Sequence, residues 1–106
     1  MAIPSITSTD ELEDVLKSNV NVMIYFSAPW CAPCKEARKV LDQCIPKFPS
    51  VYFVEVKFDD SPYIVERCQV SGVPAFIAFK NGTPMTYREG RITVPKLEEV
   101  IQTSFP

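Results

Sequence analysis

Two cysteines, Cys31 and Cys34, stand three positions apart where an apolar run gives way to a helical pattern. Residues 22–26 are continuously apolar and too few for a buried helix, which predicts a central strand covered on both faces. After the pair, apolar residues recur at helical spacing as far as Phe48, and Cys34 falls on their stripe. We therefore expect Cys31 at the mouth of a helix, Cys34 turned inward, and Pro33 in the first turn, where its missing N–H costs nothing.

A thiol at a helix N-terminus has altered chemistry. Unpaired N–H groups and the positive end of the helix dipole stabilise an anion, so the pKa of such a thiol falls below its reference of about 8.5. Cys31 is therefore predicted to be the nucleophile. Cys34, partly buried and less exposed, would attack the resulting mixed disulfide from inside and release the substrate in reduced form.

A zinc site and a structural disulfide are the alternative uses of such a pair. Zinc would need two more ligands, but the chain has no His, and Cys44 and Cys68 stand alone on apolar stripes. A disulfide that closes so small a ring removes little entropy from the unfolded chain. Thiol–disulfide exchange is favoured, no metal is expected, and Cys44 and Cys68 are predicted to be core residues.

The residues around the pair resemble the thioredoxin active-site motif, which here reads Trp30-Cys31-Ala32-Pro33-Cys34-Lys35. Residues 26–28 precede it much as in that family, and residues 72–74 followed by 79–82 look like the family's second signature. The resemblance covers nearly the whole chain. It implies one thioredoxin domain over residues 1–106 and a protein disulfide reductase that an NADPH-dependent thioredoxin reductase recharges.

Composition agrees with a single domain: the chain has 106 residues, of which 46% are hydrophobic. A net charge of −2 leaves no basic footprint, so nucleic acid and membranes are not expected as partners. Nicotinamide and flavin would belong to the reductase, because the chain lacks a Gly-rich dinucleotide fingerprint. No secretory signal is evident, which favours the reducing cytoplasm, although a fragment of a secreted protein would look the same. The protein is expected to be a monomer.

The rest of the chain alternates between strand and helix signals. The predicted order is βαβαβαββα in the α/β class, a thioredoxin fold with a central mixed sheet and helices on both faces. Outside the active-site region, the sequence predicts an edge strand with Ile3 and Ile6 and further strands at residues 51–58, 73–79 and 85–87. It predicts helix starts at Ser8, Ser61 and Thr93, and a hairpin turn at Asn81-Gly82.

The second signature adds expectations about substrate binding. By resemblance, the Val73–Pro74 bond is cis and Pro74 sits against the two cysteines. The exposed backbone of Val73 could then pair with an extended substrate segment by strand-like hydrogen bonds. The residues expected to form a substrate-binding rim around Cys31 are Trp30, Pro29, Val73, Gly90 and Arg91.

The sequence departs from the family at three positions. Thioredoxins usually carry a buried acid where this chain has Tyr25, and a phenol with a pKa of about 10 is a poor base. Either water, held by Glu55, accepts the proton of Cys34, or Cys34 resolves the mixed disulfide slowly. Ala32 replaces a Gly inside the motif and favours helical geometry, and Lys39 replaces a kinking proline, so the helix should be straighter.

Three functions remain in view. The first is a general protein disulfide reductase, and the second is a specialised dithiol donor to one enzyme, such as a peroxidase. The third is a non-catalytic interaction module in which the cysteines are vestigial. Intact Cys31 and Cys34 favour activity over the module, while nothing in the sequence separates the first two.

Overall fold

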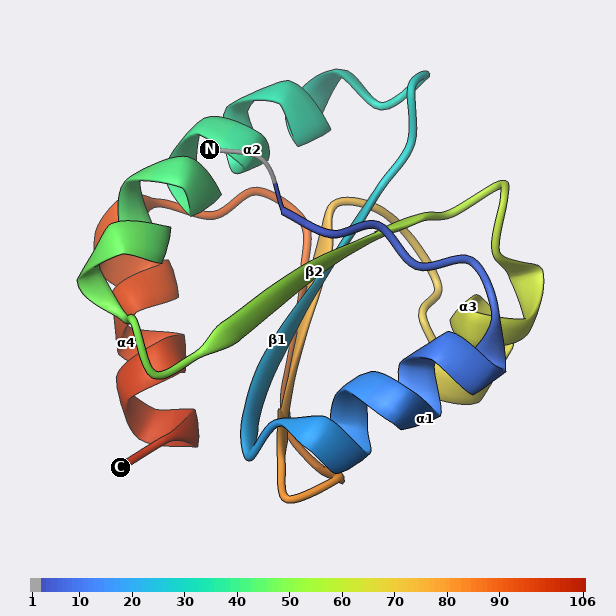
Figure 1. Cartoon of the computed structure of the whole chain (residues 1–106). Coiled ribbons are helices and arrows are strands. Elements are labelled where there is room, and N and C mark those ends of the chain that lie inside the picture. The colour runs from blue at the N-terminus through green and yellow to red at the C-terminus, as the bar shows by residue number, and fades with distance from the viewer. Residues whose placement is uncertain (1–2) are drawn as a thin grey trace.

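The computed structural model describes residues 3–106 as a twisted sheet between two pairs of helices (Figure 1). Met1 and Ala2, part of the predicted domain, lie outside the described residues. The elements in chain order are α1 (Thr9–Ser18), β1 (Asn21–Ser27), α2 (Ala32–Cys44), a 3₁₀ turn η1 (Ile45–Lys47), β2 (Tyr52–Lys57), α3 (Pro62–Cys68), β3 (Ala75–Lys80), β4 (Thr83–Glu89) and α4 (Val94–Ser104).

The strands within residues 3–106 form one sheet in the order β2-β1-β3-β4. β1 pairs parallel with β2 and antiparallel with β3, and β3 pairs antiparallel with β4. The sheet is therefore mixed, as predicted. β1 is central because its residues 22–26 are apolar on both faces, and each is at most 1% exposed.

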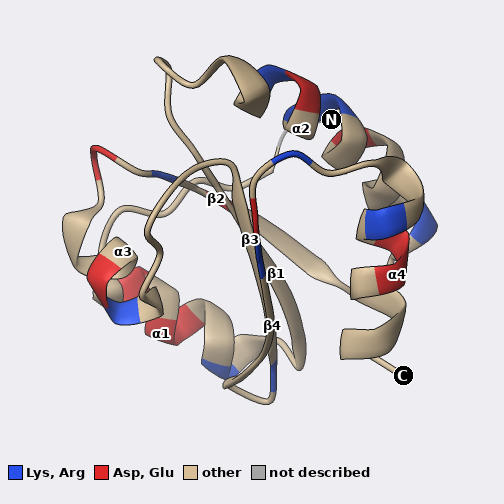
Figure 2. Cartoon of the chain, turned by 180° about the vertical axis from the view of Figure 1, so that it is seen from behind, with Lys and Arg blue, Asp and Glu red and all other residues tan. Residues whose placement is uncertain are grey.

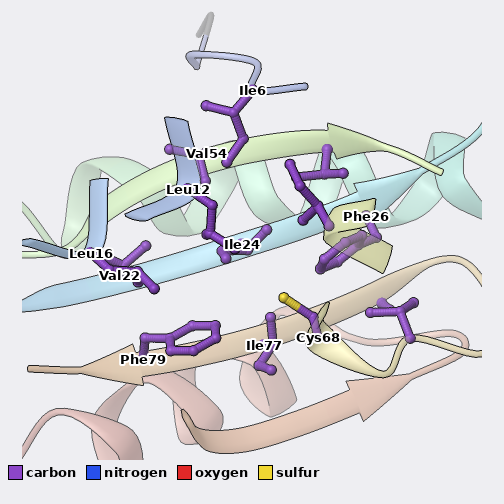
Figure 3. Close-up of a cluster of buried hydrophobic side chains, with 14 residues drawn as sticks. Ile6, Leu12, Leu16, Val22, Ile24, Phe26, Val54, Cys68, Ile77 and Phe79 are labelled. Atoms are coloured by element: carbon purple, nitrogen blue, oxygen red, sulfur yellow. The ribbon is translucent and has the colours of Figure 1, made fainter. Parts of the chain in front are cut away.

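The two faces of the sheet support separate cores. α1 and α3 cover one face, where β1 contributes Val22, Ile24 and Phe26 (Figure 3). α2 and α4 cover the other face, where β1 contributes Met23 and Tyr25. This alternation follows from the two-residue period of a strand, and it places Tyr25 under the helix that begins at the cysteine pair.

The predicted helix starts are largely correct. Ser8 caps α1 in a reciprocal box with Glu11, and the Thr93 hydroxyl accepts a hydrogen bond from the Lys96 N–H at the start of α4. Ser61 precedes α3, but its hydroxyl donates to the carbonyl of Ile6 at 3.4 Å instead of capping the helix.

The predicted first strand is wrong as an element. The N-terminal segment forms a single parallel bridge between Ser5 and Glu55, flanked by hydrogen bonds from Ile6 N–H to Glu55 O and from Glu55 N–H to Pro4 O. Pro4 has no N–H to extend the ladder, which limits pairing at this edge. The described order is therefore αβαβαββα, within the predicted fold class.

Cys44 and Cys68 are buried in opposite cores and lie outside any disulfide among the described residues. Figure 3 shows Cys68 among the apolar side chains between α3 and the sheet. Burial raises the pKa of the Cys44 thiol, and it raises the pKa of the Cys68 thiol to about 11. Both groups are therefore poor nucleophiles near neutral pH, as expected of core cysteines.

Residues of both charge signs are interspersed along the helices (Figure 2). None of the helices within residues 3–106 is long and apolar enough to cross a bilayer.

Candidate active site

The cysteine pair lies at the junction between β1 and α2. The chain leaves β1 at Ser27, and the Cys31 N–H closes a turn by donating to the Ala28 carbonyl at 3.1 Å. Cys31 is the N-cap residue of α2, Ala32 and Pro33 are its first two residues, and Cys34 lies in its first turn. The Cys31 side chain makes no capping hydrogen bond, and its sulfur lies at the positive end of the helix dipole, an environment that lowers a thiol pKa.

Cys31 and Cys34 form a disulfide in this structure. Each is only 5% exposed, so the expected difference in exposure between the two residues is wrong for the disulfide form. Bonding draws both sulfurs into one cluster with Ala28, against which Phe58 and Val73 pack. The cysteines differ instead in their position on the helix, since Cys31 caps it and Cys34 belongs to it.

A cavity of about 570 Å³ lies beside the disulfide, bounded by the end of β1, the start of α2 and the end of β2. A volume of this size is typical of a small-molecule or water-filled site. The residues that line the cavity are Tyr25, Ser27, Ala28, Pro29, Cys31, Cys34, Lys35, Arg38, Glu55, Lys57, Asp59 and Asp60.

Tyr25 is 1% exposed, and its hydroxyl donates a 2.8 Å hydrogen bond to the carbonyl of Cys34. Its ring stacks on Phe76 with the ring centroids 5.2 Å apart. Burial, and secondarily the negative charge of Glu55, raises the pKa of Tyr25 to about 12. The phenol is thus a structural donor to the start of α2, and it remains protonated at neutral pH.

Glu55 lies opposite Tyr25 in the parallel register of β1 and β2. Its carboxylate accepts hydrogen bonds from the Ser27 hydroxyl at 3.2 Å and from Arg38 Nη1 at 3.4 Å. Arg38 also binds Asp42 through Nε at 3.0 Å. Sequence reasoning named Glu55 but missed Ser27 and Arg38, although Arg38 follows Cys34 by four residues and so shares its helix face.

Trp30, a residue of the expected substrate-binding rim, is 64% exposed. Its indole N–H donates to Asp59 Oδ2 at 2.6 Å, which ties the Trp30 ring to the end of β2. Asp59 was missed because this contact joins loops 29 residues apart. Pro29 is also exposed next to Trp30.

The Val73–Pro74 peptide bond is cis, as the resemblance implied. Val73 is half-buried and packs on the cluster that contains both cysteines. The Gly90 N–H donates to the Pro74 carbonyl at 2.8 Å, so the end of β4 lies against this loop. Arg91 follows as an exposed residue. The structure thus brings Val73 to the cysteines and Gly90 to Pro74, while the part each plays in binding a substrate stays a prediction.

Within residues 3–106, no cluster of three or more His, Cys, Asp or Glu side chains is arranged to hold a metal ion.

A cysteine pair at a helix mouth, already joined as a disulfide and packed against a cis-proline loop, defines a thiol–disulfide exchange site. The Thioredoxin family model matches residues 4–103. Thioredoxin-3 of Saccharomyces cerevisiae mitochondria is 36% identical over 81 residues, covering 76% of this chain and 64% of the relative. The chain belongs to the thioredoxin family.

Solved structures agree. The oxidised form of mitochondrial thioredoxin 3 from Saccharomyces cerevisiae has a TM-score of 0.90 and 33% identity, covering 95% of this chain and 94% of that one. A second structure concerns the thiol resolving mechanism in yeast mitochondrial 1-Cys peroxiredoxin via glutathione/thioredoxin systems. It has a TM-score of 0.90 and 31% identity, and the match covers 96% of this chain and 95% of that one. The chain spans between 52% and 64% of the first curated relatives that it matches.

Proposed function

We propose that this protein reduces disulfide bonds in other proteins. The Cys31 thiolate attacks one sulfur of the substrate disulfide and displaces the other as a thiolate. Cys34 then attacks Cys31 in the mixed disulfide, which forms the Cys31–Cys34 disulfide and releases the second substrate sulfur. Two electrons pass to the substrate. The observation that carries the proposal is the position of Cys31 at the N-cap of α2, bonded to Cys34 of the same helix.

Substrate binding is proposed along the loop that precedes β3. Val73 packs on the cysteine cluster and its backbone would pair with an extended segment of the substrate. Trp30 and Pro29 on one side, with Gly90 and Arg91 on the other, would line the approach to Cys31. Backbone pairing is insensitive to side-chain identity, so this mode would accept many protein disulfides.

The reducing partner is proposed to be an NADPH-dependent thioredoxin reductase, which would return the disulfide to the dithiol. We further propose that the protein is a monomer in the cytoplasm. Two buried thiols, Cys44 and Cys68, suit a reducing compartment. Mitochondrial and chloroplastic proteins stand among the relatives, so those reducing interiors are the alternatives to be tested by localisation.

A second candidate is a dedicated dithiol donor to a peroxidase. The likeness to the structure concerned with 1-Cys peroxiredoxin resolution favours it. A third, the interaction module with vestigial cysteines, finds less support, since the pair is close enough to form a disulfide.

The test is insulin reduction with NADPH and a thioredoxin reductase. We expect turnover by the wild type, loss of turnover in Cys31→Ser, and near-wild-type turnover in Cys68→Ala, the matched control that alters a buried cysteine elsewhere. An inactive wild type, or an active Cys31→Ser, would refute the proposal. Repeating the assay with an oxidised 1-Cys peroxiredoxin separates the candidates, because a dedicated donor would reduce it far faster than insulin.

A further inference from the structure

Resolution of the mixed disulfide requires Cys34 to lose its proton, because the thiolate is the attacking species. Tyr25 occupies the position from which the family usually supplies a base. Its hydroxyl is engaged as a donor to the Cys34 carbonyl, and a buried phenol holds its own proton at neutral pH. Tyr25 is therefore not the acceptor for the Cys34 proton, and the same cavity wall offers carboxylates that could be.

We propose that Glu55 is this proton acceptor, and that Ser27 and Arg38 hold its carboxylate in place for the transfer. The inference rests on the proposed function, since it concerns the second step of the same exchange. Glu55 would receive the proton across the cavity that both residues line, through water where the two groups do not touch.

The geometry for this transfer comes from two elements. Glu55 is on β2 beside Tyr25 of β1, which places it next to the residue whose hydroxyl contacts Cys34. Arg38 lies one helical turn after Cys34 on α2, and long side chains on a helix lean back toward the preceding turn. The ion pair between Arg38 Nη1 and Glu55, at 3.4 Å, therefore draws the carboxylate toward the helix turn that carries Cys34.

The carboxylate of Glu55 is also largely shielded from solvent. Its side chain is only 16% exposed, and hydrogen bonds from Ser27 and Arg38 restrict its motion. Asp59, another carboxylate of the cavity wall, is exposed and engaged with the Trp30 indole, and Asp60 is exposed. The other charged or titratable groups that face this region are Tyr25 on β1, Lys35, Arg38 and Asp42 on α2, and Lys57 on β2.

The proton and electron balance is as follows. As the Cys34 sulfur attacks the Cys31 sulfur of the mixed disulfide, the Cys34 thiol gives up its proton to the Glu55 carboxylate. The bond between Cys31 and the substrate sulfur breaks, and the substrate leaves as a thiolate. Glu55 passes its proton to the departing thiolate, directly or through water, so Glu55 regains its charge and the protein is left oxidised by two electrons.

The reduced protein can be tested in a stopped-flow instrument with dithiodipyridine, which releases one thiopyridone when Cys31 attacks and a second when Cys34 resolves the adduct. With Glu55 as acceptor, the resolution rate in the wild type is expected to be nearly independent of pH between about 6 and 8, because attack then does not depend on prior ionisation of the Cys34 thiol by solvent. In Glu55→Gln, resolution depends on spontaneous ionisation of a thiol with a pKa of about 8.5 or above.

That dependence sets the size of the effect. At pH 7 only about 3% of such a thiol is ionised, so Glu55→Gln is expected to resolve more slowly by up to about 30-fold, the limit in which the wild type reacts as fast as a fully ionised thiolate, and to gain about tenfold in rate per pH unit. The first release, which reports Cys31 attack, is expected within about twofold of wild type. Glu66→Gln, the same change at an exposed residue of α3, is the matched control and should keep the wild-type profile.

A folded Glu55→Gln protein with a pH-independent resolution rate near that of wild type would overturn the proposal. So would a wild-type resolution rate that itself rises about tenfold per pH unit between about 6 and 8, a result that does not depend on any variant folding. Failure of the proposed function would look different, because the wild type would then fail in insulin reduction whatever the profile of the second release.

Discussion

Replacing Tyr25 with Phe removes one hydroxyl from the wall of the cavity and leaves the ring in place. The hydroxyl donates a 2.8 Å hydrogen bond to the Cys34 carbonyl in a site where Tyr25 is 1% exposed. A neutral hydrogen bond of this kind contributes about 1 kcal/mol net, and the stack on Phe76 persists. We therefore expect Tyr25→Phe to lower the free energy of unfolding by about 1 kcal/mol at neutral pH, and Tm by about 4 °C.

Alkaline pH is expected to cancel this difference. Burial first, and the charge of Glu55 second, raises the pKa of Tyr25 to about 12 from an ordinary value of 10.0. Because the folded pKa is the higher one, wild-type stability is unaffected below the unfolded pKa and is lost as pH rises from there through the folded pKa. At about pH 11 the loss amounts to about 1.4 kcal/mol, which the variant escapes, so the two proteins should be about equally stable there.

Urea unfolding of the oxidised proteins, followed by circular dichroism at about pH 7, 9 and 11, measures both effects. The remaining tyrosines, the buried thiols and the lysines titrate alike in the two proteins, so their contributions cancel in the difference. A difference that stays constant with pH would mean that the phenol is not buried in the folded state. If Tyr25→Phe lowered the free energy of unfolding by more than about 3 kcal/mol at neutral pH, the hydroxyl would have to stabilise more than its one hydrogen bond to a carbonyl.

Three further predictions concern the cysteines and the same cavity. Cys34→Ser should trap protein substrates as mixed disulfides on Cys31, detectable by mass spectrometry, and adducts formed instead on Cys34 of Cys31→Ser would reverse the assignment of the two thiols. Replacing Cys44 and Cys68 with Ala should cost about 1 kcal/mol each in urea unfolding, additively because they lie in different cores, and leave insulin turnover within about twofold. A large loss of turnover in the folded double variant would contradict this. Tyr25→Asp should lose about 3–5 kcal/mol through the missing ring and, because Glu55 already serves as acceptor, resolve mixed disulfides no faster than the wild type near neutral pH; a clearly faster stopped-flow rate in the folded variant would count against Glu55 as the acceptor.

Features specified by neighbouring residues could be predicted from the sequence. The helix-mouth position of Cys31 follows from an apolar run, a proline and a helical stripe that are contiguous in the chain. The hairpin between β3 and β4 follows from Asn81 and Gly82, which adopt φ values of 52° and 77°, as the predicted tight turn requires. In these places local conformational preference and burial favour the same structure.

Contacts between distant segments were not predictable in the same way. The Arg38–Glu55 pair depends on the rotation of α2 over the sheet and on the register of β2, neither of which a local pattern encodes. The Trp30–Asp59 hydrogen bond depends on the relative height of two loops. The N-terminal segment was predicted to be a strand because of Ile3 and Ile6, but Pro4 limits the pairing that it can form to a single bridge.

The register between β1 and β2 explains why a phenol at position 25 and a carboxylate at position 55 suit each other. The two residues are directly paired on adjacent parallel strands, which lie about 4.8 Å apart. Two carboxylates at that separation in a sheltered site could not both stay ionised, and one would be driven to hold its proton. Tyr25 avoids that conflict because the phenol keeps its proton at neutral pH, so Arg38 and Ser27 bind the Glu55 carboxylate with no second carboxylate at position 25. Position 25 on β1 and position 55 on β2 both line the cavity that contains Cys34, so a base at either position can reach Cys34. With Glu55 as the base, Tyr25 is free to anchor the start of α2 through its hydrogen bond to the Cys34 carbonyl.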